Sequence, residues 1–198
     1  MLTLPLLRKM LNRAGTELKA NSKYLCELDS VAGDGDHGIT IGRMADVMKE
    51  KTEDTTIDTM RVLLDELGDA FMGINGGSAG PLWGTVFTGM AEGIDDQAEL
   101  TDLELRKMFT QAKEDFMDIS KAKPGDKTMV DALYPAIDAI IETQGSLKEI
   151  MTAAAAAADA GAEQTSTMVA RFGRAKNMGE RSIGTKDPGA VSIAILFN

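Results

Sequence analysis

Hydrophobic residues recur every three or four positions along most of this chain, which is the period of an amphipathic α-helix. The first segment has this spacing in its leucines, at Leu4, Leu7, Leu11 and Leu18. Pro5 is compatible with it, because a helix tolerates proline in its first turn. The same pattern predicts further helices over residues 22–29, 38–51, 57–74, 81–90, 102–119, 129–141, 147–162 and 190–196.

Residues at the predicted helix ends support several of these boundaries. Ser22, Thr101 and Asp187 each stand where an N-cap is expected, and Pro188 follows as a first-turn proline. The last segment, 190–196, alternates in a way that would also suit a strand, but the cap and proline before it favour a helix. No strand–helix alternation or internal repeat is present, and the connections are short. We therefore expect an all-α fold, a bundle or barrel of antiparallel helices.

Composition and charge narrow the class of protein. The chain has 198 residues, enough for a substantial core, and we expect one domain over residues 1–198. Its net charge of −10 argues against nucleic acid or an anionic membrane as a partner, because both attract basic surfaces. It has one cysteine, Cys26, no secretion signal, and no apolar run near the roughly 20 residues of a membrane span. We therefore expect a cytoplasmic, soluble protein.

The stretch from Asp29 to Gly42 has the most distinctive chemistry of the chain. It contains three aspartates, Asp29, Asp34 and Asp36, together with the only histidine, His37. Carboxylates at contact distance repel one another, so a positive partner is needed to hold them together. Mg²⁺ is commonly held by a few carboxylates and substrate phosphates, and the start of the next helix favours an anion through its free amides. The stretch therefore predicts a Mg²⁺ site with a phosphate nearby.

This stretch has two other interpretations. Aspartate and glycine are common in plain turns between helices, and that interpretation stays open at this point. A calcium EF-hand loop needs a glutamate at its twelfth position, whereas counting from each aspartate leads to Thr40, Ala45 or Val47. An EF-hand is therefore excluded.

Later segments contain further parts that suit phosphoryl transfer. Residues 75–81 form a second glycine-rich loop before a helix, a place where backbone amides cradle phosphates, although such loops are also simple connections. Residues 171–189 contain the densest group of basic side chains. The common P-loop and protein-kinase motifs are absent. Clustered aspartates, glycine loops and basic residues are nevertheless the parts that phosphoryl transfer requires.

Four ordered motifs extend over nearly the whole chain. They are Asp29 with Gly33-Asp34-Gly35-Asp36-His37-Gly38; Gly76-Gly77-Ser78-Ala79-Gly80-Pro81-Leu82; Pro124-Gly125-Asp126-Lys127-Thr128-Met129; and Gly179-Glu180-Arg181-Ser182-Ile183-Gly184 with Asp187-Pro188-Gly189. With these motifs the chain resembles the L subunit of dihydroxyacetone kinase, a family that also supplies the nucleotide-binding domain of single-chain ATP-dependent kinases. The length is similar to that of a free-standing L subunit, so we expect no attached dihydroxyacetone-binding domain.

The resemblance implies both a fold and a set of site residues. The fold would be an antiparallel up-and-down barrel of about eight helices with the nucleotide at one end. Asp29, Asp34 and Asp36 match the family's catalytic aspartates, which coordinate two Mg²⁺ ions. The expected contacts to ADP or ATP are His37, Gly38, Ile39, Thr40, Ser78, Ala79, Ser120, Met129, Arg174, Asp187, Pro188 and Gly189.

The resemblance also implies a reaction and two protein partners. ADP would stay bound as a coenzyme, a phosphohistidine of an M-type subunit would rephosphorylate it, and the γ-phosphoryl group would pass to dihydroxyacetone held on a K-type subunit. Two alternatives are a subunit that uses ATP directly beside a K-type partner, and a nucleotide-loaded regulatory module that binds a transcription factor or partner subunit. His37 could itself carry the phosphoryl group, but the resemblance favours a nucleotide contact.

The chain departs from the family pattern at two places. Ser78-Ala79 stands where many relatives have alanine followed by serine, and Ser120 stands where a glycine is common. Both exchanges involve small side chains, so they bear on individual contacts rather than on the fold.

Overall fold

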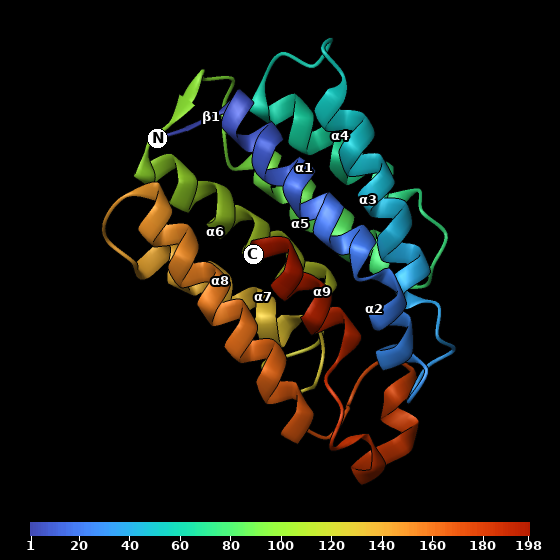
Figure 1. Ribbon diagram of the computed structural model, residues 1–198. Helices are drawn as coiled ribbons and strands as arrows, with labels where there is room; N and C mark the ends of the chain where they lie inside the picture. The colour runs from blue at the N-terminus through green and yellow to red at the C-terminus, as the bar shows by residue number, and fades with distance from the viewer.

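The computed structural model describes all 198 residues and is almost entirely helical (Figure 1). Its α-helices are α1 (Leu4–Ala20), α2 (Ser22–Asp29), α3 (His37–Glu53), α4 (Met60–Met72), α5 (Ala79–Glu92), α6 (Asp102–Ile119), α7 (Val130–Glu142), α8 (Leu147–Gln164) and α9 (Pro188–Phe197). Two 3-10 helices, η1 (Thr165–Thr167) and η2 (Arg174–Ser182), lie between α8 and α9. The only strands, β1 (Leu2–Thr3) and β2 (Glu99–Leu100), form one short antiparallel pair.

Eight of the helices form a closed ring. Each helix from α3 to α8 packs against the next one along the chain, and α1 packs against both α9 and α3, which closes the circle. Helix α2 lies outside the ring and contacts α3 and α9. Figure 1 shows α2, the loop that follows it and η2 at the same end of the molecule. The predicted all-α barrel of about eight helices is confirmed.

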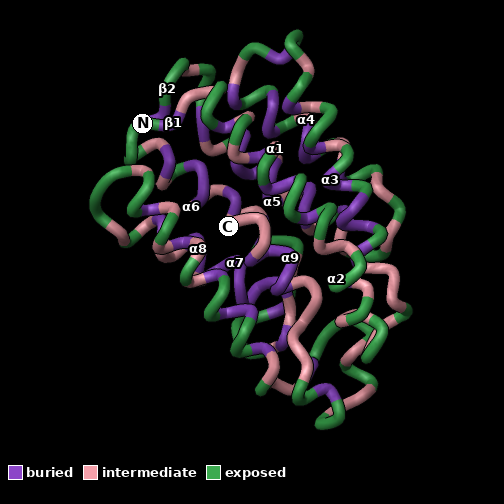
Figure 2. Tube along the Cα trace, in the orientation of Figure 1, coloured by how far each residue is buried: buried purple, intermediate pink, exposed green.

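A continuous hydrophobic core fills the ring, and Figure 2 shows the buried residues along the inward faces of the helices. Phe71, Trp83 and Phe87 are among its largest fully buried side chains. Their rings meet edge to face, with centroids 6.3 Å apart for Phe71 and Trp83 and 5.0 Å apart for Phe71 and Phe87. This edge-to-face geometry stabilises aromatic pairs beyond the contribution of the area they bury.

No helix is both long enough and apolar enough to cross a membrane.

Local capping explains where the later helices begin. Thr101 forms a capping box at the start of α6, as its position in the sequence predicts. The Asp187 side chain accepts a hydrogen bond from the amide of Ala190, and Pro188 is the first residue of α9. Because this cap and the helical proline act together, residues 190–196 form a helix and not a strand.

The N-cap of α2 and the first residue of α4 differ from the sequence prediction. Asn21, not Ser22, is the N-cap of α2, since the Ser22 hydroxyl turns back and donates to the end of α1. Helix α4 begins at Met60 and not at residue 57, because the Thr59 hydroxyl caps it. In each case one hydroxyl group explains the difference, because Ser22 bonds to the end of α1 and Thr59 bonds to the first turn of α4.

Small residues allow α7 and α8 to approach one another closely. Helix α8 has six consecutive alanines, residues 153–158, followed by Gly161. A Cβ atom at Gly161 would lie only 1.9 Å from the carbonyl oxygen of Asp131 in α7. A side-chain rotation cannot relieve this contact, because the obstacle is backbone. Gly161 therefore permits the observed spacing of the two helices.

We expect Gly161→Ala to lower the free energy of unfolding by roughly 2–4 kcal/mol, since α7 and α8 must separate to admit the methyl group. Gly73→Ala is the matched control, because a Cβ there would lie 3.5 Å from its nearest neighbour, the Ala70 carbonyl oxygen. That variant should change stability by less than about 1 kcal/mol. Urea unfolding followed by circular dichroism measures both, and equal losses in the two variants would contradict the packing argument.

Candidate magnesium and phosphate site

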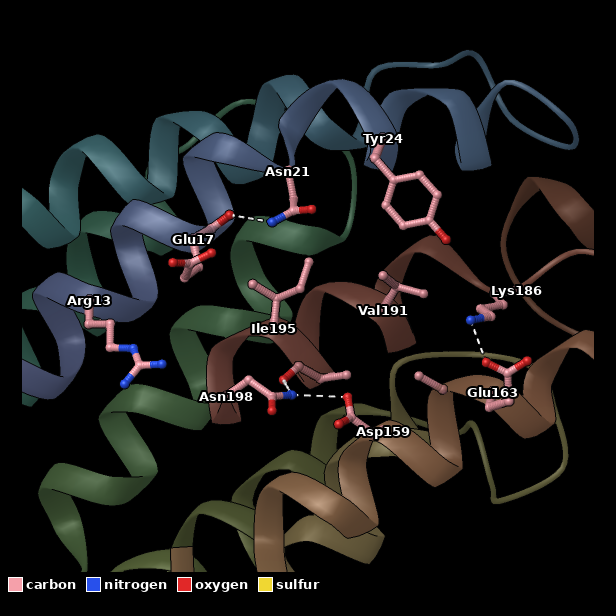
Figure 3. A pocket seen from close by; sticks show the side chains of 12 residues that line it. Arg13, Glu17, Asn21, Tyr24, Asp159, Glu163, Lys186, Val191, Ile195 and Asn198 are labelled. Atoms are coloured by element: carbon pink, nitrogen blue, oxygen red, sulfur yellow. Dashed lines mark hydrogen bonds and ion pairs between the residues drawn. The ribbon is translucent and has the colours of Figure 1, made fainter. Parts of the chain in front are cut away.

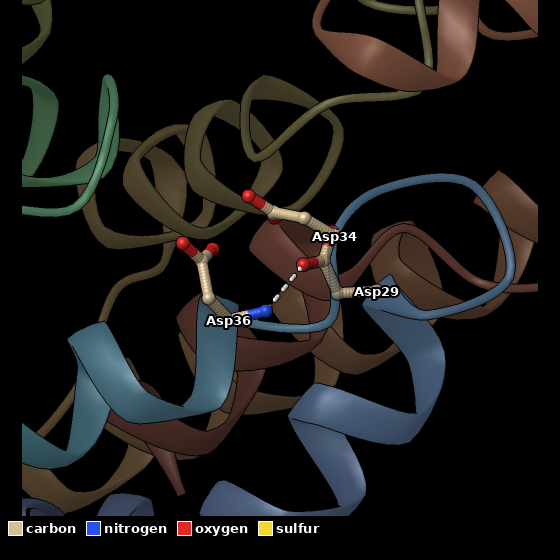
Figure 4. Close-up of side chains that lie close together, drawn as sticks. All are labelled: Asp29, Asp34 and Asp36. Atoms are coloured by element: carbon tan, nitrogen blue, oxygen red, sulfur yellow. Dashed lines mark hydrogen bonds between the residues drawn. The ribbon is translucent and has the colours of Figure 1, made fainter.

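The three predicted metal ligands lie together at one end of the barrel. Asp29 is the last residue of α2, Asp34 lies in the loop that follows, and Asp36 immediately precedes α3. Each offers one carboxylate oxygen, and these oxygens all lie within 4.8 Å of one another. Figure 4 shows the three side chains gathered around the same point. Asp34 is exposed and the other two are half-buried, so the cluster is open to solvent.

The Asp29 carboxylate organises the loop that holds the other two. Its Oδ2 accepts hydrogen bonds from the amides of Asp36 at 3.0 Å and His37 at 3.3 Å. A Cβ atom at Gly33 would lie 2.2 Å from its other oxygen, so only glycine allows this approach. The last residue of α2 thereby determines where the loop turns and where α3 begins.

The amides at the start of α3 differ from the sequence prediction. We expected residues 37–40 to present free amides to an anion, but the His37 amide donates to Asp29. The amides of Ile39 and Thr40 donate to the carbonyl oxygen of Asp36, at 3.0 and 3.1 Å. The expectation of free amides at these three positions is wrong, because the Asp29 carboxylate takes the His37 amide and the Asp36 carbonyl oxygen takes the other two.

The donor set of the cluster fits a hard divalent cation. It consists of carboxylate oxygens alone, which suit Mg²⁺, whereas zinc is more often bound by nitrogen and sulfur. The Asp36 side chain makes no capping bond to α3, so its oxygens stay available to a ligand. The one cation paired with the cluster is Arg174, which forms an ion pair with Asp34. Three carboxylates therefore share a single positive partner, and their residual repulsion favours binding of metal ions.

Arg174 reaches this cluster from a distant part of the sequence. It is the first residue of η2, within the basic stretch predicted to contact the nucleotide. The neighbouring Arg171 is anchored differently, since its amide donates to the Asp126 carbonyl oxygen at 3.1 Å and its side chain lies 3.7 Å from the Asp126 carboxylate. The basic stretch is thus attached to two separate loops of the barrel end.

The second glycine-rich loop lies against the start of α3. A Cβ atom at Gly76 would come within 2.1 Å of the Thr40 hydroxyl oxygen, and Arg43 of α3 donates to the same loop. The predicted contacts Ser78 and Ala79 are the N-cap and first residue of α5, and no side chain caps that helix. The partial positive charge at the start of α5 is therefore without a side-chain partner.

His37 connects the aspartate cluster to α9. Its Nε2 lies 3.2 Å from the hydroxyl of Ser192, and that hydroxyl donates to the Gly189 carbonyl oxygen at 2.8 Å. Burial lowers the pKa of His37, although the nearby Asp29 carboxylate acts in the opposite direction. The imidazole is therefore neutral at pH 7.

The other late contacts predicted from the sequence form the start of α9. The Asp187 carboxylate accepts a hydrogen bond from the Ala190 amide at 2.7 Å. Burial of this carboxyl group raises the pKa of Asp187 to about 7, and the hydrogen bond from Ala190 opposes that shift. A Cβ atom at Gly189 would lie 3.4 Å from the Cβ of the buried Met129. Met129 and Gly189 are therefore neighbours, and Ser192 links this region to His37.

Ser120 has no side-chain interaction that connects it to the other predicted contacts. It ends α6, and its hydroxyl accepts a hydrogen bond only from the amide of Ala122, at 3.4 Å. Its contacts are local.

A separate groove of about 450 Å³ lies between α1, α2, α8 and α9 (Figure 3). None of the predicted metal or nucleotide residues lines it. Polar side chains across its floor are already paired, Lys186 with Glu163, and Asn198 with Asp159 at 2.9 Å. The groove is therefore distinct from the aspartate cluster.

Two residues at this end of the barrel were not predicted as site residues. Ser192 holds His37, but it lies in an apolar segment in which nothing marks it as special. Lys127 is buried beneath the basic stretch, and the only signal for it was its place in the Pro-Gly-Asp-Lys-Thr motif.

Comparison with known proteins relates the chain to one family. Residues 31–198 match the DAK2 domain. The chain is 35% identical over 190 residues to the ADP-binding subunit DhaL of the PEP-dependent dihydroxyacetone kinase of Escherichia coli K12, covering 94% of this chain and 90% of that protein. It is 36% identical over 195 residues to an L-erythrulose kinase of Pectobacterium atrosepticum, covering 95% of this chain and 33% of that protein.

The fold is similar to that of a solved kinase. The crystal structure of the dihydroxyacetone kinase of C. freundii in complex with AMP-PNP and Mg²⁺ matches 97% of this chain and 32% of its own, with a TM-score of 0.73 and 27% identity. The match to the DAK2 domain covers most of the present chain, and the relative from E. coli is matched over nearly its whole length. The chain therefore belongs to the DAK2 domain family.

Proposed function

We propose that this protein is the ADP/ATP-binding, phosphoryl-transferring subunit of a dihydroxyacetone kinase. The observation that carries the proposal is the convergence of three carboxylates within 4.8 Å at a barrel end that also has an uncapped helix start and an arginine. These are the parts needed to hold a metal–nucleotide complex. The relationship to a DhaL subunit of similar length supports the same assignment.

The aspartates would hold the metal ions and the surrounding segments would hold the nucleotide. Asp29, Asp34 and Asp36 would bind two Mg²⁺ ions, and the start of α5 and Arg174 would bind phosphate oxygens. When bound, the Mg²⁺–nucleotide complex supplies the phosphoryl group and neutralises its charge. The chain's own contribution is orientation, since Asp29 rigidly positions Asp36 through the Asp36 amide.

His37 would contact the nucleotide and not carry the phosphoryl group. Its Nε2 is engaged with Ser192, which fixes the ring against α9. A phosphoryl carrier must present an unhindered nitrogen to two successive partners, and the half-buried, anchored ring does not suit that role. Met129 and the Pro188-Gly189 backbone, on the other side of Ser192, would line the position of the base.

The subunit would act between two partner proteins. In this proposal residues 1–198 form one nucleotide-binding domain that accepts a phosphoryl group from a phosphohistidine of an M-type subunit. It delivers that group to dihydroxyacetone held on a K-type subunit, in the cytoplasm. The overall activity would be that of a phosphoenolpyruvate–glycerone phosphotransferase, and relatives named as ADP-binding subunits of PEP-dependent kinases support it.

Replacing a metal ligand tests the site directly. We expect Asp34→Asn and Asp36→Asn each to weaken binding of ADP in the presence of Mg²⁺ by about 100-fold or more, because each removes an anionic ligand. Isothermal titration calorimetry at fixed Mg²⁺ concentration measures this loss. Asp65→Asn is the control, since Asp65 is an exposed carboxylate of α4 outside the cluster. Unchanged binding by both cluster variants, with normal helix content, would remove the metal assignment.

The mode of nucleotide use has its own test. We expect native mass spectrometry of the desalted protein to detect ADP with two Mg²⁺ ions, in slow exchange with added ATP, because a coenzyme must outlast many turnovers. Nucleotide that is lost on desalting, or a preference for ATP, would instead favour a subunit that uses ATP directly beside a K-type partner.

The role of His37 can be separated from that of the aspartates. We expect His37→Ala to retain phosphoryl transfer at a reduced rate and with weaker nucleotide binding, since only a contact is lost. A quenched-flow assay with a labelled phosphohistidine donor measures the transfer. Complete loss of transfer with normal ADP affinity would be the result expected of a phosphoryl carrier.

A further inference from the structure

Lys127 is a buried cation that the proposed chemistry does not use. It lies in the loop between α6 and α7, and only 4% of its surface is exposed. Its ammonium group donates hydrogen bonds to three backbone carbonyl oxygens, of Thr165 at 2.7 Å, Ser182 at 2.8 Å and Thr185 at 2.5 Å. No carboxylate lies within ion-pair distance of it, although Asp187 is near enough to influence its charge.

This arrangement lowers the stability of the fold in two ways, through burial of a charge and through backbone strain. Burial of an ammonium group disfavours its charged form, and burial lowers the pKa of Lys127. Lys127 is also the only residue other than glycine with a positive φ, +60°. A side chain in the left-handed region costs roughly 1–2 kcal/mol, and such strain persists where the surrounding contacts hold it in place.

The loop that carries Lys127 is itself firmly attached to α7. The buried Asp131 carboxylate accepts hydrogen bonds from the amides of Gly125 at 2.5 Å and Thr128 at 2.8 Å. Each bond joins residues that are close in the sequence, and the two donors, Gly125 and Thr128, lie on either side of Lys127. They place its backbone before the ammonium group meets any partner.

The three carbonyl groups lie at the two ends of the long connection between α8 and α9. We call residues 166–186 of this connection the η2 segment. Thr165 immediately precedes this segment, whereas Ser182 and Thr185 lie at its far end. The Gly184 amide donates to the Ser166 carbonyl oxygen at 2.7 Å, which joins the same two ends. Lys127 thus connects both ends of the segment to the core of the barrel.

The tip of the η2 segment extends toward the aspartate cluster. Most of residues 171–181 are exposed and only lightly anchored, yet Arg174 within them forms the ion pair with Asp34. A segment of this kind has little packing of its own to hold it. Its position depends on the attachment of its two ends.

We infer that Lys127 is a positioning residue of the candidate nucleotide site, which clamps both ends of the η2 segment and so holds Arg174 beside Asp34. The inference rests on the proposed function for its effect on nucleotide binding. Lys127 does not touch the carboxylates of the cluster, and it acts through the segment.

The test compares Lys127→Met with Lys123→Met. The first keeps the aliphatic length and removes the ammonium group, and the second removes an exposed lysine of the same loop that makes no side-chain hydrogen bond. Limited trypsin digestion of the nucleotide-free protein reports on the η2 segment, which has cleavage sites at Arg171, Arg174, Lys176 and Arg181. Calorimetric titration with ADP and Mg²⁺ reports on the site.

We expect Lys127→Met to raise the rate of cleavage between residues 171 and 181 at least roughly tenfold, and to weaken ADP binding at least roughly tenfold, because several charge-assisted hydrogen bonds are lost. Lys123→Met should match the unsubstituted protein in both assays. Faster cleavage with unchanged ADP affinity would overturn the inference and leave Lys127 a structural residue only. Unchanged cleavage would overturn it as well.

A second variant covers the case in which Lys127→Met does not fold. Thr165→Val keeps the shape of the side chain but removes the acceptor for the Asp187 amide, 2.9 Å away, at the base of the same segment. It should produce the same paired changes to a smaller extent, and their absence would count against the clamp. Failure of the unsubstituted protein to bind ADP at all would refute the proposed function, while the cleavage assay would still decide whether Lys127 holds the segment.

Discussion

Mutual repulsion among three carboxylates is the constraint on which this end of the molecule depends. One carboxylate oxygen of each of Asp29, Asp34 and Asp36 lies within 4.8 Å of the others, although only one arginine pairs with them. The free energy of folding has to offset the repulsion among these charges. The hydrogen bonds from the amides of Asp36 and His37 to Asp29 contribute part of that free energy. The loop is thereby fixed by the chain's own hydrogen bonds, which is the preorganisation that the proposed cation site would need.

The barrel explains why motifs spread over the whole chain meet at one place. In a ring of antiparallel helices, every second connection lies at the same end. The connections after α2, α4, α6 and α8 carry the aspartates, the second glycine loop, the Lys127 loop and the η2 segment in turn. The contacts between Gly76 and Thr40, and between Arg174 and Asp34, join these connections to one another. A ring in which each helix packs mainly against its neighbours in the chain can therefore bring together residues that are more than a hundred positions apart.

Charge is distributed unevenly over the protein. The chain carries a net charge of −10, yet the η2 segment concentrates basic side chains beside the most acidic cluster. Opposite charges at a short distance shape a local field that the overall charge does not reveal. This explains how an acidic protein can present a site for phosphate groups.

Much of the fold followed from local sequence signals. The helical period located every α-helix, and the caps Thr101 and Asp187 marked the starts of α6 and α9. Both signals depend only on residues within one or two turns of the helix. The N-cap of α2 and the start of α4 show the limit of that reasoning. The Ser22 hydroxyl bonds to α1 and does not cap α2, and α4, capped by Thr59, begins three residues after the first hydrophobic residue of the pattern.

The sequence by itself determined the helices, the carboxylates of the candidate metal site and the family. Only the tertiary structure decided which groups those donors face. The amides at the start of α3 are taken by Asp29 and Asp36, His37 is held by Ser192, and Lys127 meets carbonyl groups on both sides of η2. These pairings join segments that become neighbours when the ring of helices closes. No local pattern can specify these pairings. The spacing of residues along the chain reflects contacts within one helix, but not contacts between segments that are far apart in the sequence.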